Sequence, residues 1–254
     1  ILNKNENNLG LVRHVDYGVS LTNSEIIIVG AGDDISLPNR AEIICEQFRK
    51  HPEALSISHC YNIIDDSGEI SLSNPVFLNQ GKYTISDYMK PGKKIPIYGA
   101  TRAYKKEIFK SFPKLSRNCQ AEDAALVFRS LMIGDIYHSS QTCLNYRAHS
   151  GSISKKFDFD SAKSIYKQNL KDLDFGISKQ LIDPTNYNNI KNIMKRRLQA
   201  GLILKKMRGK SRSISYYFGN VFFSNLFSFN EKKNLFKGLV KYHTPSNLLK
   251  FIKK

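Results

Sequence analysis

The 254-residue sequence contains no tryptophan and only four cysteines. The cysteines form no C-x-x-C pair and have no histidine at metal-site spacing, which argues against a disulfide scaffold and is typical of a reducing compartment. No run of about 18 or more apolar residues is present, so the sequence predicts no ordinary transmembrane helix. The first residues lack both the pattern of a signal peptide and an initiator methionine, and we expect the chain to be a fragment.

Acidic residues are scarce in the last 100 residues. Residues 1–154 hold 17 basic and 16 acidic side chains, whereas residues 155–254 hold 22 basic and 6 acidic ones, and the total net charge is +17. A basic region of this size attracts polyanions, either nucleic acid or an anionic membrane leaflet, although solvated helices with outward-facing lysines have the same composition. We therefore expect a balanced domain over residues 1–154 and a basic region over residues 155–254.

The first domain has the pattern of an α/β sheet. Helices are predicted over residues 9–22 and 39–50, where apolar residues recur at helical spacing. Between them, residues 26–29 form a continuous β-branched run, typical of a buried strand in a parallel sheet. Further along, the expected elements are strands over 54–61 and 136–146, a strand turning into a helix over 102–109, a short helix over 85–89 inside an irregular excursion of residues 70–98, and a helix over 121–133 that ends at Gly134 as a C′ glycine.

Beyond residue 154 the pattern is helical and rich in lysine, over residues 160–180, 184–208 and 231–253. An aromatic stretch over residues 214–229 interrupts these segments. Its apolar side chains suit a membrane interface, and they suit equally the packing of a helical appendage on the first domain. The side chains in question are Phe218, Val221, Phe222, Leu226 and Phe229.

Asp33 and Asp34 follow the predicted buried strand, at a glycine-rich turn. Ligands of open α/β sheets bind at the carboxyl ends of strands, and two adjacent carboxylates there suit a hard divalent cation that holds the phosphates of a nucleotide. The alternative is a helix N-terminus at which the macrodipole favours acidic residues.

A second acidic pair, Glu122 and Asp123, stands at the start of a predicted helix, where capping is again the alternative. Arg147 and His149 follow the last predicted strand. A lone histidine is more often structural than functional, and the sequence alone leaves its role open.

Taken in order, these segments resemble the family 2 glycosyltransferases of the GT-A fold, especially bacterial enzymes of surface-polysaccharide assembly. The resemblance covers about residues 1–154. Its motifs are Asn8-Leu9-Gly10; Gly32-Asp33-Asp34-Ile35-Ser36 with Pro38 and Arg40; Gly99-Ala100-Thr101 with Tyr104 and Phe109; Glu122-Asp123 with Arg129 and Gly134; and Tyr146-Arg147-Ala148-His149 with Ser152 and Ser154.

The resemblance implies an α/β fold: a Rossmann-like mixed sheet flanked by helices, followed by the helical basic appendage. It implies transfer of a sugar from a nucleotide diphosphate donor to an acceptor hydroxyl, usually with inversion. Asp33 and Asp34 would hold Mg²⁺ or Mn²⁺ at the diphosphate. Asp123 would be the general base, with Glu122 holding it in place or exchanging roles with it. Gly99 and Ala100 would allow close approach to the donor sugar.

Arg147 and His149 resemble a family loop that closes near the diphosphate, where a cation would help to neutralise the leaving group. Two departures from the family matter. Ala31 stands where the metal motif usually has its first aspartate, so Asp33 would be the main ligand. The first strand and helix of the family, which bind the nucleotide base and ribose, would lie before Ile1, so we expect this chain alone to be inactive.

The resemblance gives the basic region a function. Acceptors of this class are commonly lipid-linked saccharides, so residues 155–254 would bind an anionic membrane surface, and the protein would be cytoplasmic and peripheral at the inner face of the plasma membrane. No nucleic-acid partner is expected, because the aromatic residues are not interleaved with the lysines. The alternatives are a non-enzymatic basic protein that binds membrane or nucleic acid through an α/β scaffold, an inactive transferase and, least favoured, a viral-type polymerase with its Gly-Asp-Asp on a hairpin.

Overall fold

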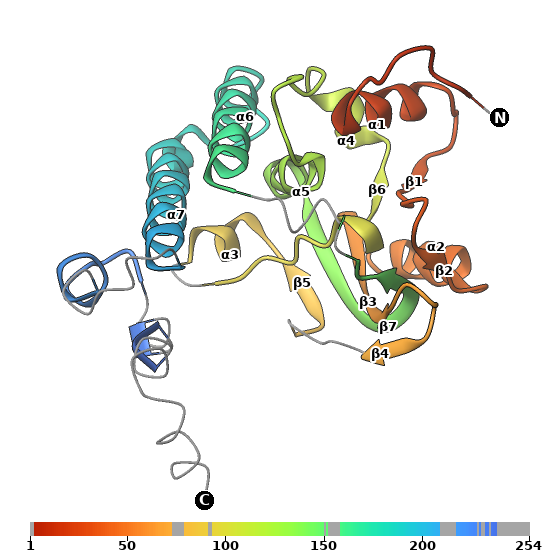
Figure 1. The fold of residues 1–254 in the computed structure, drawn as a ribbon. Helices are drawn as coiled ribbons and strands as arrows, with labels where there is room; N and C mark the ends of the chain where they lie inside the picture. Colours follow the sequence, from red (N-terminus) through yellow and green to blue (C-terminus); the bar gives the residue numbers. More distant parts are fainter. Residues whose placement is uncertain are drawn as a thin grey trace, which may run out of the picture.

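The computed structural model describes residues 3–72, 79–90, 93–149, 151, 158–208, 217–227, 229, 232–233 and 235–237. Within these residues a mixed sheet lies at the centre of the first part of the chain, and the last helices extend to one side of it (Figure 1). Its strands are β1 (Ile26–Ile28), β2 (Ile35–Ser36), β3 (Ala54–Ile64), β4 (Ile70–Leu72), β5 (Gly81–Tyr83), β6 (Ala103–Lys105) and β7 (Asp135–Arg147). The predicted mixed α/β class is confirmed.

The strand order is β1-β6-β3-β7-β2, and only the central pair, β3 and β7, is parallel. β4 pairs with β3 and β5 pairs with β7, both antiparallel. Ile64 lies opposite Arg147 at the far ends of the two central strands. The carboxyl ends of two parallel strands therefore meet at one edge of the sheet, where the acidic turn after β3 begins.

The prediction that residues 26–29 form a buried strand of a parallel sheet is wrong. β1 pairs antiparallel with β6, its residues are half-buried, and it ends the strand order among the described residues. A continuous β-branched run predicts apolar surroundings on both faces of a strand, and Ile26 and Ile28 do pack against a core cluster. The run carries no information about the direction of its partner.

Helices cover both faces of the sheet. Ala103 of β6 packs with α2, whereas the next residue, Tyr104, packs with α1, α4 and α5, because successive strand residues point to opposite faces. The helices are α1 (Leu11–Ser20), α2 (Arg40–Lys50), α3 (Ile85–Met89), α4 (Glu107–Ser111), α5 (Glu122–Ile133), α6 (Phe159–Ser178) and α7 (Tyr187–Arg208), with the short 3₁₀ turns η1 (Gly99–Thr101) and η3 (Pro184–Asn186) and the π turn η4 (Phe218–Phe222).

The predicted helices and strands recur within a few residues, and α3 occupies the predicted range within residues 70–98. That excursion also contains β4 and β5, while residues 73–78 and 91–92 lie outside the described part. Gly134 does end α5, but its φ of −178° is extended rather than left-handed, so the C′ interpretation is wrong. A Cβ on Gly134 would lie 2.9 Å from the Leu55 side chain and 3.0 Å from the Glu53 carbonyl oxygen, and close packing is what requires glycine there.

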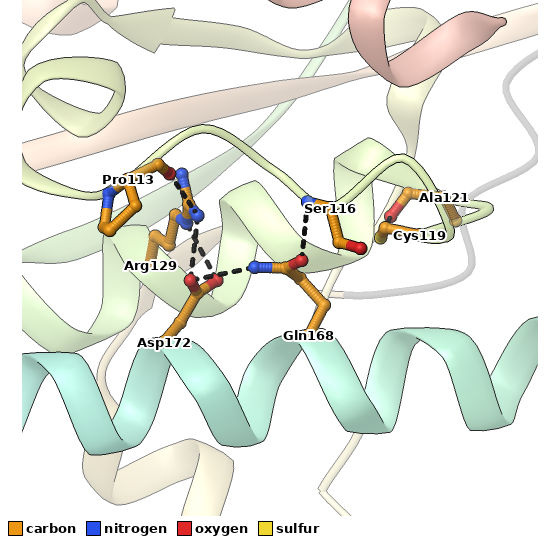
Figure 2. Close-up of polar contacts among 7 residues, drawn as sticks. All are labelled: Pro113, Ser116, Cys119, Ala121, Arg129, Gln168 and Asp172. Carbon is orange, nitrogen blue, oxygen red and sulfur yellow. Dashed lines mark hydrogen bonds and ion pairs between the residues drawn. The ribbon is translucent and has the colours of Figure 1, made fainter.

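The helices after residue 158 share an apolar core with the sheet and α5 rather than standing apart from them. Leu173 of α6 and Ile190, Ile193 and Met194 of α7 belong to the same apolar cluster as α5. Beside that cluster lies a buried ion pair, in which Arg129 of α5 donates from Nε and one terminal nitrogen to both carboxylate oxygens of Asp172, each at 2.8 Å (Figure 2).

Three further hydrogen bonds complete this junction. Arg129 also donates to the carbonyl oxygen of Pro113, and Gln168 links the Asp172 carboxylate to the backbone N–H of Ser116 (Figure 2). Arg129 and Asp172 are 2% and 3% exposed at their side chains, so the pair is shielded from water. A pair buried in this way keeps α6 in a fixed register on α5.

The aromatic stretch is only partly buried, and its membrane role stays a prediction. Tyr217, Val221 and Phe227 are buried in a small cluster with α7 residues, whereas Phe223 and Phe229 are 77% and 79% exposed. Residues 238–254, which include most of the predicted helix over 231–253, and residues 214–216 lie outside the described part. None of the helices in the described part has both the length and the apolar character needed to cross a membrane.

Candidate active site

The Gly-Asp-Asp turn is not a helix N-terminus. β2 follows Asp34 directly and pairs with β7, where Ile35 lies opposite Asn145, and α2 begins only at Arg40. The macrodipole of α2 therefore does not account for Asp33 and Asp34, because its effect is confined to the first turn of a helix. The capping alternative for this pair is excluded.

Arg147 and His149 reach the aspartate pair from the end of β7. The backbone N–H of Arg147 donates to Asp34 Oδ1 at 3.0 Å, and the Arg147 Nε donates to the carbonyl oxygen of Asp33 at 2.9 Å. His149 Nε2 lies 2.9 Å from Asp33 Oδ2, and this hydrogen bond lowers the pKa of Asp33. Four of the residues singled out in the sequence thus form one cluster, although the aspartate pair and the Arg147–His149 pair lie more than 110 positions apart in the sequence.

The Arg147 side chain links two turns by hydrogen bonds to backbone carbonyl oxygens. Its terminal nitrogen donates to the carbonyl oxygens of Asp65 and Asp66, in the turn after β3, at 2.7 and 3.0 Å. The side chain thereby joins the turn at Asp33 to the end of the neighbouring central strand. Its expected action on a leaving diphosphate stays a prediction.

The cluster fits a divalent cation that is only partly enclosed by protein. Asp33 has a side chain that is 48% exposed, and Asp34 Oδ2 is buried without a hydrogen-bond partner, while burial raises the pKa of Asp34. Among the described residues no three His, Cys, Asp or Glu side chains are arranged to hold a metal ion by themselves. Mg²⁺ is typically held by one or two carboxylates together with the phosphates of a substrate, and two carboxylates are what the turn offers.

Arg40 joins the Gly-Asp-Asp turn to the second part of the site. Its buried guanidinium donates to the carbonyl oxygen of Val29 at 2.7 Å and to that of Ala100 at 2.8 Å. It also donates to the hydroxyl of Ser36 at 2.9 Å. One side chain at the start of α2 therefore contacts the residue after β1, the last residue of β2 and the 3₁₀ turn η1.

Gly99 of η1 packs directly against Asp123. A Cβ on Gly99 would lie 2.7 Å from Asp123 Oδ2, so even alanine would force one of the two to move. The N–H of Gly99 is a hydrogen-bond donor to the Asp123 carboxylate. The neighbour that requires glycine at position 99 is therefore Asp123, and an approach of the donor sugar to Gly99 and Ala100 stays a prediction.

Glu122 and Asp123 occupy the first turn of α5. Asp123 Oδ1 accepts a hydrogen bond from the backbone N–H of Ala124 at 2.7 Å, so helix capping is part of what holds it. Glu122 is 7% exposed; its burial, and next the neighbouring Asp123 carboxylate, raise its pKa to about 7. Burial also raises the pKa of Asp123, against the opposing effects of the Ala124 N–H and the cation of Arg102.

Arg102 is a fully buried cation near the acid pair. Its guanidinium donates to the Ser56 hydroxyl at 3.2 Å and to the carbonyl oxygen of Pro96, and the structure gives it no salt-bridge partner among the described acids. Its charge favours the ionised form of Asp123. The sequence pattern missed this residue, because an arginine inside a short predicted strand gives no sign of being buried.

The raised pKa of Glu122 has a consequence for stability. The folded state keeps the Glu122 proton up to about pH 7, whereas the unfolded chain loses it near the ordinary value of 4.5. The free energy of unfolding should therefore fall between these two pH values by up to about 3 kcal/mol. Glu122→Gln removes that loss, so the variant should match the wild type near pH 4 and be more stable by up to this amount at pH 8.

Urea unfolding at the two pH values measures the difference. Glu107→Gln is the matched control, because Glu107 also stands in the first turn of a helix but is exposed, and it should show no gain that depends on pH. A gain in the free energy of unfolding of Glu122→Gln that is the same at pH 4 and pH 8 would contradict the raised pKa of Glu122.

An apolar pocket of about 570 Å³ lies beside the acid pair. Its walls come from α3, α5, α6 and α7, and Glu122 and Asp123 line it on the α5 side. Asn169 of α6 also lines it and was not singled out in the sequence. No sequence signal marked it, because only the structure shows that Gln168, Asn169 and Asp172 lie on the buried side of α6.

Comparisons with known proteins concern the family and the fold. The family model described as glycosyl transferase family 2 matches residues 1–112. The Staphylococcus aureus TarS structure of residues 1–349 is 11% identical, with a TM-score of 0.53, and the match covers 83% of this chain and 58% of that one. The same protein in complex with UDP-GlcNAc is 10% identical, with a TM-score of 0.49 and coverage of 91% and 61%. No curated protein matched the sequence.

The likeness to the first TarS structure confirms the predicted GT-A type of fold, a mixed sheet flanked by helices. This chain spans about three fifths of the length of the solved structures that it matches.

Proposed function

We propose that this chain, whose residues 1–112 belong to glycosyl transferase family 2, transfers a sugar from a nucleotide diphosphate sugar to an acceptor hydroxyl. The observation that carries the proposal is the contact chain through η1. Gly99 touches Asp123, and the carbonyl of the next residue is tied by Arg40 to the strand that leads into the Gly-Asp-Asp turn. A donor site and an acceptor base must be held in fixed relation for such a transfer, and these contacts supply that relation.

Asp33 and Asp34 are proposed to hold a Mg²⁺ or Mn²⁺ ion together with the donor diphosphate. When bound, the cation would neutralise the charge that grows on the departing diphosphate. The Asp33 carboxylate is half-exposed and Asp34 Oδ2 lacks a partner, which supports this assignment. His149, now paired with Asp33, and Arg147, now tethered to the turn after β3, lie at the position where they would face the same phosphates.

Asp123 is proposed to accept the proton of the acceptor hydroxyl as it attacks the anomeric carbon from the side opposite the diphosphate. A carboxylate with a raised pKa is a better base near neutral pH than an ordinary aspartate, and the N–H groups of Gly99 and Ala124 hold it in one orientation. Glu122, with a pKa of about 7, is partly protonated there, which supports a positioning role for it.

Donor binding tests the proposal. Saturation-transfer NMR with a panel of UDP-, GDP- and TDP-sugars in Mg²⁺ or Mn²⁺ should show binding of at least one member, lost on chelation. Asp33→Asn should weaken that binding about tenfold or more, since one charge-bearing ligand is removed. Asp66→Asn, an exposed aspartate in the neighbouring turn, is the control and should bind normally. Binding by neither the wild type nor the control, or equal binding by Asp33→Asn, would refute the donor site.

The acceptor is proposed to be a lipid-linked saccharide of bacterial surface-polysaccharide synthesis, met at the inner face of the plasma membrane. The described end of the chain supports this. Phe223 and Phe229 are exposed, and so are Lys233 and Lys237 a few residues further along the sequence, which offers apolar anchors and positive charge. Each lysine near an anionic leaflet contributes about 1 kcal/mol of attraction, and Phe side chains favour the interface.

Flotation with vesicles checks the membrane proposal. The protein should float with vesicles containing phosphatidylglycerol but not with pure phosphatidylcholine, and binding should fall as salt rises. Replacing Phe223 and Phe229 by serine should reduce flotation, whereas Ile70→Ser, at an exposed position of β4, should not. Flotation that depends neither on salt concentration nor on lipid charge would contradict the proposal. Flotation that is unchanged by the replacement of Phe223 and Phe229 would contradict it too.

A further inference from the structure

The pocket beside the acid pair has walls suited to hydrocarbon rather than to sugar. Its volume of about 570 Å³ is that of a small-molecule site, and the charged residues that line it are Glu122, Asp123 and Arg197. A buried saccharide needs partners for each hydroxyl, because an unpaired polar group is costly to bury. Most of the lining side chains are aliphatic or aromatic, and representative ones are Ile95, Ile97, Val127, Phe128, Ile165 and Leu198.

Arg197 ties α7 to α3 at the edge of the pocket. One of its terminal nitrogens donates to the carbonyl oxygen of Tyr88 at 2.8 Å, and its guanidinium lies 4.2 Å from the centre of the Tyr88 ring. The carboxyls of Glu122 and Asp123 are the other charged groups that line the pocket, at its α5 side.

One polar atom in the apolar part of the pocket lacks a partner. Asn169 is 6% exposed, lines the pocket and has its Oδ1 buried without a hydrogen bond. A buried acceptor left unpaired costs stability, so its presence points to a donor that a ligand brings. A cavity with apolar walls and a few convergent polar atoms is the usual form of a ligand site.

We propose that this pocket, formed by α5 together with α3, α6 and α7, binds the apolar portion of an amphipathic acceptor. The reacting hydroxyl lies at Asp123, and a second hydroxyl or amide N–H of the acceptor donates to Asn169 Oδ1. The inference rests on the proposed function and names its acceptor class: a molecule with a hydrocarbon or aromatic group close to the hydroxyl that receives the sugar. The helices after residue 158 thereby supply one side of the acceptor site.

The probe is n-octyl β-D-glucoside below its micelle concentration, with methyl β-D-glucoside as the head group alone. Calorimetry should detect binding of the octyl compound and none of the methyl compound. Ala162→Phe fills the pocket from α6 and should weaken octyl glucoside binding at least tenfold. Ser178→Phe adds the same ring at an exposed position of α6 outside the pocket and should leave binding unchanged.

Asn169→Leu separates binding from structure. It should weaken octyl glucoside binding severalfold while the melting temperature stays the same or rises, since an unpaired buried acceptor is removed. A lowered melting temperature with unchanged binding would make Asn169 structural and overturn its assignment. If Ala162→Phe fails to fold, Leu198→Gln, at a half-buried position of α7, serves instead.

Equal binding of the octyl and methyl glucosides, or octyl binding that survives both pocket variants, would overturn the pocket assignment. Donor binding is measured separately by saturation-transfer NMR. Binding of octyl glucoside without binding of any nucleotide sugar would refute the proposed function but not the pocket assignment. Binding of a nucleotide sugar without binding of octyl glucoside would refute the pocket assignment alone.

Discussion

Asp123→Asn should lower the turnover of sugar transfer by about 10²- to 10⁴-fold, the usual contribution of a positioned general base. Asparagine keeps the size of the side chain and one acceptor oxygen for the N–H of Ala124, so the fold should be preserved. The amide has no basic lone pair to take the acceptor proton. Donor affinity should stay within about twofold, because the Gly-Asp-Asp turn is untouched; steady-state kinetics and donor titration measure the two effects.

Glu122→Gln tests which of the two carboxyls, Glu122 or Asp123, is the general base. If Asp123 is the base, Glu122→Gln should retain most of the transfer activity, and the activity of the wild type should fall as pH drops through the raised pKa of Asp123. Loss of turnover in Glu122→Gln with near-normal turnover in Asp123→Asn would reverse the assignment. Loss in both variants with intact donor binding would show that the pair acts as a unit.

Asp172→Asn should lower the free energy of unfolding by about 3–5 kcal/mol, because it leaves the buried guanidinium of Arg129 without its counter-charge. Both carboxylate oxygens of Asp172 accept from Arg129, and one also accepts from Gln168, so the loss reaches every contact of Figure 2 that joins α6 to α5. Denaturant unfolding measures it. Asp174→Asn, an exposed position on the same helix, should change stability by less than about 1 kcal/mol.

A double replacement tests the physical cause. Arg129→Met combined with Asp172→Leu removes both charges together and fills the space with apolar atoms, which is often nearly neutral for a buried pair. The double variant should therefore be more stable than Asp172→Asn alone. Two results would show that the pair does not hold α6 in place. One is a free energy of unfolding for Asp172→Asn within about 1 kcal/mol of the wild-type value, and the other is a double variant that is less stable than Asp172→Asn.

The sequence predicted the positions of the site residues well, because they follow strand ends and helix starts that local patterns mark clearly. It placed Asp33 and Asp34 after a strand, Gly99 before a strand and Glu122–Asp123 at a helix start, and all three positions are confirmed. It did not predict that Arg147 would be tied to two carbonyl oxygens after β3, since that contact depends on the register of two strands more than 80 residues apart.

The errors share a physical cause as well. The direction of β1 and the role of Gly134 depend on neighbours distant in sequence, β6 in the first case and Leu55 in the second. Arg102 was overlooked because burial of a cation leaves no periodic signal. Asn169 was overlooked for the opposite reason: the lysine-rich pattern of α6 hid a short polar face that packs inward, and only the structure shows which face is covered.

The anomeric configuration of the product tests the central claim most directly. A single displacement with Asp123 as base requires the acceptor oxygen to arrive opposite the leaving diphosphate. The product formed by the protein with its nucleotide sugar and an alkyl glycoside acceptor should then have the configuration opposite to that of the donor, as read from the coupling constant of its anomeric proton. A product with the donor configuration retained would contradict the account.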